Sequence, residues 1–65
     1  MFDGVPEFAI ESLRKAEFLL TKAVEADDES REDYLRMKAE EAFDWAAFGG
    51  VSRSYIDCVR SHYLI

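Results

Sequence analysis

The pair Gly49-Gly50 most strongly constrains this chain, because it interrupts 65 residues that otherwise have the pattern of helices. Residues 1–44 carry thirteen acidic side chains and six basic ones, a net charge of −7. Residues 45–65 carry one acidic side chain, Asp57, and two basic ones, a net charge of +1. An acidic body followed by a short and weakly basic helix is typical of a binding protein rather than of a catalyst.

The helical spacing of apolar residues predicts three helices, over residues 6–26, 31–48 and 53–63. Ser30 is expected to cap the start of the second helix, and Ser52 the start of the third. Gly49 or Gly50 is expected to take the left-handed conformation that ends the second helix. Because short loops join the helices, we expect residues 1–65 to form a single all-α domain, a small antiparallel three-helix bundle.

A chain of this length buries only just enough apolar surface to offset the loss of conformational entropy on folding. The apolar fraction of 49% nevertheless argues against disorder, and it leaves open a homodimer that would bury more of this surface. Phe43 is expected at the centre of the core. Around it we expect a stripe on the first helix and the inward side of the third, namely Ala9, Leu13, Ala16, Leu20, Val24, Tyr55, Ile56, Val59 and Tyr63.

The second helix is apolar on two sides, and its second stripe consists of Tyr34, Met37, Trp45 and Phe48. Such a helix is either packed between neighbouring helices or covered by another chain, and the sequence leaves both readings open. Phe18 falls on the polar side of the first helix, and large aromatic side chains are common at the centre of protein interfaces. We therefore predict a protein-binding surface that contains Phe18, Glu25, Glu32, Tyr34, Trp45 and Phe48.

The charge of the chain bears on the kind of partner. An isoelectric point near 4.6 disfavours contact with nucleic acid phosphates or anionic lipids, and it suits a basic protein surface. We therefore expect a non-enzymatic protein that binds a larger partner, a protein with a basic surface, as an inhibitor or accessory regulator. Small proteins carried by mobile genetic elements provide the analogy, which rests on size and charge alone.

An alternative function comes from residues 46–61. Ala46 is a small residue within a helix, Gly50-Val51-Ser52 has the composition of a turn, and an amphipathic helix follows. This order resembles a helix-turn-helix motif, and the resemblance implies a DNA-binding regulator that inserts the third helix into the major groove. Only two arginines supply positive charge there. The contact residues that the resemblance implies are Ser52, Arg53, Ser54, Tyr55 and Arg60.

Catalytic, metal and cofactor sites are not expected. Cys58 and His62 lie four residues apart on one helical face, but neither a third catalytic group nor further metal ligands accompany them. The sequence has no Gly-rich phosphate loop. Without a long apolar run, a basic leader or a second cysteine, the expected location is the cytoplasm, with no membrane contact.

Overall fold

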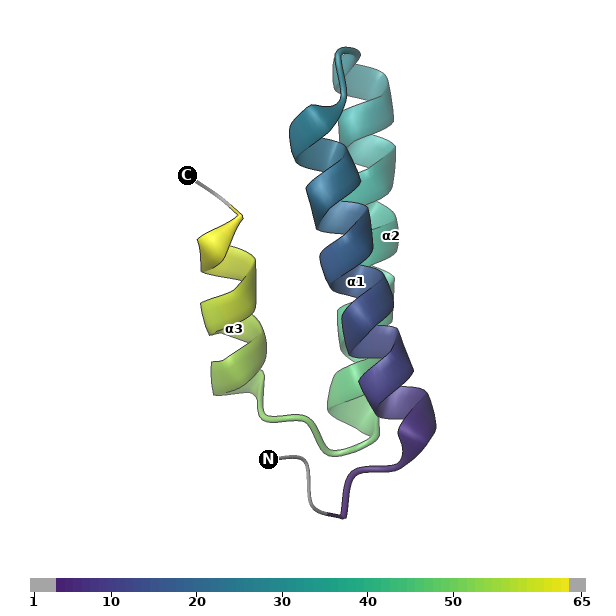
Figure 1. Ribbon diagram of the computed structural model, residues 1–65, viewed down its shortest axis with the longest axis vertical. Helices are drawn as coiled ribbons and strands as arrows, with labels where there is room; N and C mark the ends of the chain where they lie inside the picture. The colour runs from purple at the N-terminus through teal and green to yellow at the C-terminus, as the bar shows by residue number, and fades with distance from the viewer. Residues whose placement is uncertain (1–3, 64–65) are drawn as a thin grey trace.

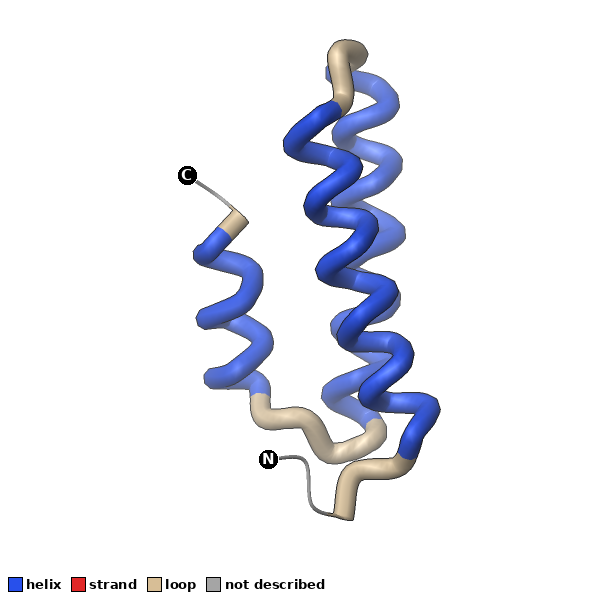
Figure 2. Tube along the Cα trace, in the orientation of Figure 1, coloured by secondary structure: helices blue, strands red, loops and turns tan. Residues whose placement is uncertain are grey.

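The computed structural model describes residues 4–63, which form three α-helices. Helix α1 spans Glu7–Glu25, α2 spans Glu29–Phe48 and α3 spans Arg53–His62. The first two helices form a long antiparallel hairpin, and α3 runs along one side of it and stops short of its tip (Figure 1). No strand occurs between residues 4 and 63 (Figure 2), so the predicted all-α fold of three helices is confirmed.

Alanine dominates the seam between α1 and α2. Ala9, Ala16 and Ala23 lie seven residues apart on α1, and all three are buried. A seven-residue repeat keeps one stripe of a helix against its partner when two helices wind around each other. Small side chains at the contact let the two helix axes come close together. The other buried residues of the hairpin are Leu13 and Leu20 on α1 and Ala39, Ala42, Phe43 and Ala46 on α2.

Phe43 and Ile56 are the largest fully buried side chains in the described part of the chain. Both belong to a single apolar cluster with Leu13 and Leu20, and Val59 of α3 packs against it. Helix α3 therefore joins the core through one buried residue and a few partly buried ones. The predicted central position of Phe43 is confirmed, since only 1% of its surface is exposed.

Two residues that the sequence placed in the core are exposed instead. Val24 is 59% exposed, because α1 extends beyond the end of α3 and its last turn lacks the cover of a third helix (Figure 1). Tyr55 is 43% exposed, because it lies beside a shallow groove between α1 and α3 rather than beneath a helix. Both predictions were wrong because helical periodicity does not say how far a neighbouring helix reaches.

Helix α2 begins two residues earlier than predicted. The carboxylate of Asp28 accepts a 3.0 Å hydrogen bond from the backbone N–H of Ser30, so Asp28 and not Ser30 is the N-cap. The charge of Asp28 also interacts favourably with the positive end of the helix dipole, which a serine cap does not do. At the start of α3 the prediction was right, because the Ser52 hydroxyl accepts a 3.2 Å hydrogen bond from the N–H of Ser54.

The two glycines that end α2 have different roles. The N–H of Gly50 donates to the carbonyl of Ala47 at 3.0 Å, and that of Val51 donates to Ala46 at 3.1 Å, which is the Schellman pattern. Gly50 has a φ of 111° and is the left-handed residue of this motif. Gly49 has an ordinary φ of −79°, but a Cβ atom there would collide with the Cβ of Ala9. Gly49 is therefore required by the close approach of α1.

Candidate protein-binding surface

The second apolar stripe of α2 is exposed. Tyr34, Trp45 and Phe48 keep 54%, 59% and 78% of their surfaces accessible to solvent, and Met37 is half exposed as well. Of the two readings that the sequence left open, the structure excludes packing beneath α1 or α3. Proteins routinely expose single apolar residues, whereas contiguous apolar surface is characteristic of contact sites.

Phe8 extends this stripe onto α1. Its ring centroid lies 6.5 Å from that of Phe48, and Phe48 in turn meets the ring of Trp45 edge-on at 5.9 Å. We term Phe8, Trp45 and Phe48 the aromatic cluster; it lies at the open end of the hairpin. The sequence-based surface did not include Phe8. The antiparallel hairpin could have revealed it, because this topology brings the first turn of α1 beside the last turn of α2.

A groove of about 380 Å³ continues from the aromatic cluster along the joint between α1 and α2. It opens away from α3, because Glu40, which contacts α3, lies two residues from Lys38 and thus on nearly the opposite side of α2. We term the cluster and this groove together the aromatic face. The groove is lined by Ser12, Lys15, Leu19, Tyr34, Lys38, Glu41, Ala42 and Trp45.

Two lysines give the groove a positive charge. The Nζ atom of Lys38 lies 3.7 Å from a carboxylate oxygen of Glu41 and 5.7 Å from the ring centre of Tyr34. Lys15 forms no hydrogen bond or ion pair with another residue of the described range 4–63. Glu41 therefore neutralises one of the two lysines, and Lys15 leaves an unpaired cation on the wall of the groove.

The negative charge of the protein is concentrated elsewhere, at the turn that joins α1 to α2. Residues 25–33 contain six acidic side chains and one basic one, a net charge of −5. The other 56 residues contain eight acidic side chains and seven basic ones. We term residues 25–33 the acidic tip; it lies at the opposite end of the hairpin from the aromatic cluster (Figure 1). The net charge of −6 therefore does not describe the aromatic face.

Phe18, Glu25 and Glu32 lie outside the aromatic face. The ring of Phe18 is 60% exposed, and the Nζ atom of Lys22 lies 5.4 Å from its centre. Lys22 also lies 4.0 Å from Glu25, whereas Glu32 accepts hydrogen bonds from Arg36 at 2.9 and 3.2 Å. The structure thus brings together the three predicted aromatic residues of α2, and it leaves these other three predicted residues apart from them.

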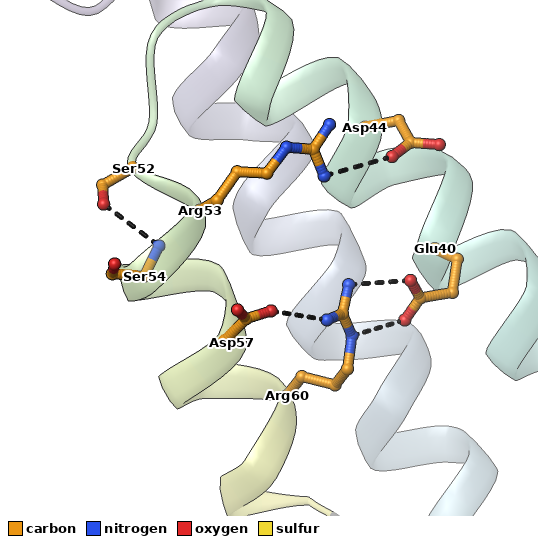
Figure 3. A network of polar contacts seen from close by, with 7 residues as sticks. All are labelled: Glu40, Asp44, Ser52, Arg53, Ser54, Asp57 and Arg60. Carbon is orange, nitrogen blue, oxygen red and sulfur yellow. Dashed lines mark hydrogen bonds and ion pairs between the residues drawn. The ribbon is translucent and has the colours of Figure 1, made fainter.

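Arg60 ties α3 to α2 (Figure 3). Its Nε and Nη2 atoms donate to the two carboxylate oxygens of Glu40 at 2.8 Å each, and Nη1 donates to Asp57 at 2.7 Å. The hydrogen bonds to Glu40 are the main cause that raises the pKa of Arg60 above its usual value; the charges of Glu40 and Asp57 add to the effect, and partial burial opposes it. The guanidinium also lies 5.4 Å from the ring centre of Phe43. The guanidinium of Arg60 therefore makes its contacts within the protein.

The other residues of the DNA-binding alternative gather around the start of α3. Arg53 lies 3.9 Å from Asp44, and Ser52 caps the helix through the N–H of Ser54 (Figure 3). Tyr55 lines the groove between α1 and α3. Helix α3 runs alongside the hairpin, whereas the two helices of a helix-turn-helix cross at a large angle (Figure 1). Both arginines of α3 thus face carboxylates, and the DNA-binding alternative stays a prediction.

Cys58 and His62 line a second groove, of about 250 Å³, between α1 and α3. Cys58 is an exposed free thiol, and the ring of His62 packs edge-on against Tyr63 with the centroids 5.3 Å apart. No hydrogen bond joins the two side chains. No group of three or more His, Cys, Asp or Glu side chains suited to a metal ion occurs in the part of the chain that the structure describes.

No protein-family model, curated protein or solved structure matches the chain. Among the described helices, none combines the length and the apolar character that a membrane span requires.

Proposed function

We propose that the protein is a non-enzymatic binding protein whose contact surface for another protein is the aromatic face. The observation that supports this is the joint exposure of Tyr34, Trp45 and Phe48 on one side of the hairpin. Trp and Tyr are enriched among the residues that provide most of the binding energy at interfaces, and such residues cluster near the centre of the contact. An aromatic ring also binds at a low entropic cost, because few of its torsion angles must be fixed.

The role of inhibitor or accessory regulator belongs to the same proposal, since a small protein acts most directly by covering a surface of its partner. The acidic tip provides a second contact, for a basic patch of that partner, and exposed charges of this kind mainly accelerate association. Phe18, Glu25 and Glu32 remain predicted contacts at or near this end of the molecule. A cytoplasmic location is also part of the proposal, because the exposed thiol of Cys58 suits a reducing compartment.

Site-specific photocrosslinking tests this proposal. A photoreactive phenylalanine analogue in place of Phe48, the most exposed aromatic residue of the part that the structure describes, should form an adduct with a discrete protein in an extract of the cells that make the chain. The same analogue in place of Phe18, an exposed aromatic residue outside the face, tests the other predicted aromatic contact separately. Adducts from Phe18 alone would move the contact surface to the outer side of α1. The absence of adducts from both positions would contradict a protein partner.

A further inference from the structure

The exposed side of α2 repeats at the spacing of a helix–helix seam. Lys38 and Trp45 lie seven residues apart, as do Tyr34, Glu41 and Phe48. A seven-residue spacing keeps side chains on one stripe that faces a neighbouring helix, and it is also the spacing of the buried alanines of α1. Helix α2 therefore carries two seams. One is occupied by α1, and the other faces solvent.

Helix α1 supplies the other side of the aromatic face at the same spacing. Phe8 and Lys15 lie seven residues apart, and Ser12 and Leu19 also lie seven apart. The aromatic face follows both helix axes, and from Tyr34 to Phe48 it spans roughly 21 Å at 1.5 Å per residue. A helix of about four turns laid in it would meet both walls at every turn, as amphipathic helices do in other two-helix grooves.

The charge of the groove favours some binding partners over others. A second copy bound face to face would bring the Lys15 and Lys38 side chains of both chains together, with only Glu41 to offset them, and like charges at an interface are costly. A nucleic acid needs several phosphate contacts, whereas the groove offers two lysines and the molecule as a whole is acidic. A protein partner with a carboxylate opposite the unpaired Lys15 would pair this cation. It would bring no like charges together and would need no further phosphate contacts.

We propose that the occupant is an amphipathic helix of another protein, with apolar residues against Leu19 and the aromatic cluster and an acidic residue opposite Lys15. This inference rests on the proposed function and adds the chemistry of the partner. It differs from the basic partner expected from the net charge, because most of that charge lies in the acidic tip and not beside the groove.

A pair of synthetic helical peptides, each about three heptads long, tests the inference. Both carry leucine at the seam positions, and the flanking positions are glutamate in one peptide and lysine in the other. Trp45 is the only tryptophan of the chain, so its fluorescence reports binding at the groove itself. We expect the acidic peptide to bind roughly tenfold more tightly than the basic one at ~50 mM salt, and the ratio to shrink as salt screens the charges.

Two neighbouring charge reversals make the test specific. Lys15→Glu should invert the preference between the two peptides, because it replaces the unpaired cation of the groove. Arg14→Glu makes the same change in charge one residue away, at an exposed position outside the groove, and should leave the preference as it is. Both side chains are exposed, so the helical circular dichroism of the two variants should match that of the wild type.

Several results would overturn the inference. These are equal affinity for the two peptides, no response to the acidic one, or an effect of Arg14→Glu as large as that of Lys15→Glu. A dimer of the unliganded protein that Trp45→Ala dissociates would make a second copy the occupant. A saturable response to oligothymidine but not to the acidic peptide would make the occupant a nucleic acid. The photocrosslinks from Phe48 test the proposed binding function separately. Those adducts would still support a protein partner if the acidic peptide does not bind.

Discussion

Replacing Gly49 with alanine should destabilise the protein, although the backbone there lies in the ordinary right-handed region that any residue adopts. At an open site with a φ near −79°, this change would raise the free energy of unfolding by about 0.4–1 kcal/mol, because alanine loses less entropy on folding. At Gly49 the new Cβ would instead overlap the Cβ of Ala9 and lie 3.2 Å from the Cζ of Phe8. The Cβ of Ala9 is fixed to the backbone and cannot rotate away.

Overpacking of a buried contact costs about 1–3 kcal/mol, so the net loss at Gly49 should be about 1–2 kcal/mol. In a domain of this size each kcal/mol shifts the melting temperature by about 4–8 °C. We therefore expect Gly49→Ala to lower the melting temperature by roughly 5–15 °C in a thermal melt followed by circular dichroism. A melting temperature above that of the wild type would show that α1 and α2 do not approach so closely.

The companion variant Ala9→Gly identifies the cause of the loss. On its own, Ala9→Gly should lower the free energy of unfolding by about 1 kcal/mol, because glycine has a lower helix propensity than alanine. The double variant should be more stable than the sum of the two single losses by about 1–2 kcal/mol, because the colliding methyl group is gone. Gly50→Ala is the control. It should also destabilise the protein, because its φ is 111°, but Ala9→Gly should not rescue it. Additive losses in the Ala9→Gly/Gly49→Ala pair would refute the steric explanation.

Phe43→Ala removes the largest buried side chain of residues 4–63 and should lower the free energy of unfolding by about 3–5 kcal/mol, enough to leave the protein largely unfolded at room temperature by circular dichroism. A melting temperature within a few degrees of the wild type would place Phe43 at the periphery. Arg60→Ala should cost roughly 1 kcal/mol in a denaturant titration, less at high salt, because it breaks the pair with Glu40. If the DNA-binding alternative holds instead, Arg60→Ala should abolish a retention of duplex DNA that the wild type shows at ~50 mM salt. Cys58→Ser and His62→Ala should each leave the function of the protein intact, because neither side chain has the partners that catalysis or metal binding requires. Loss of activity in both variants with folding intact would indicate a catalytic or metal role.

The helices could be predicted from the sequence because their signals are local. Apolar spacing, the Ser52 cap and the glycine pair each depend on a few adjacent residues, and the structure confirms the three helices that they predict. Local signals fail where two neighbouring residues suit the same role. Asp28 and Ser30 are both good N-caps, and the backbone conformation at Asp28 decides between them. The sequence predicts that Gly49 or Gly50 ends α2, but the contact of Gly49 with Ala9 joins residues forty positions apart and has no local signal.

The aromatic face could be predicted only in part, because exposure depends on where the neighbouring helices lie. The sequence shows that Tyr34, Trp45 and Phe48 share a side of α2, but not that α3 packs on the other side. The charge of the aromatic face could not be predicted from the sequence for a different reason. A net charge adds all residues together, whereas the structure separates the acidic tip from the unpaired Lys15 in the groove.

The separation of the acidic tip from the aromatic cluster also gives the molecule a permanent electric dipole along its longest dimension, which measures 39 Å. A dipole of this kind turns a protein in the field of a charged surface before any contact forms. An acidic partner helix repels the acidic tip and attracts Lys15. The protein therefore approaches this partner with the open end of the hairpin first. The orientation of the encounter is therefore set at a distance, and added salt should remove this alignment before it weakens the apolar contacts themselves.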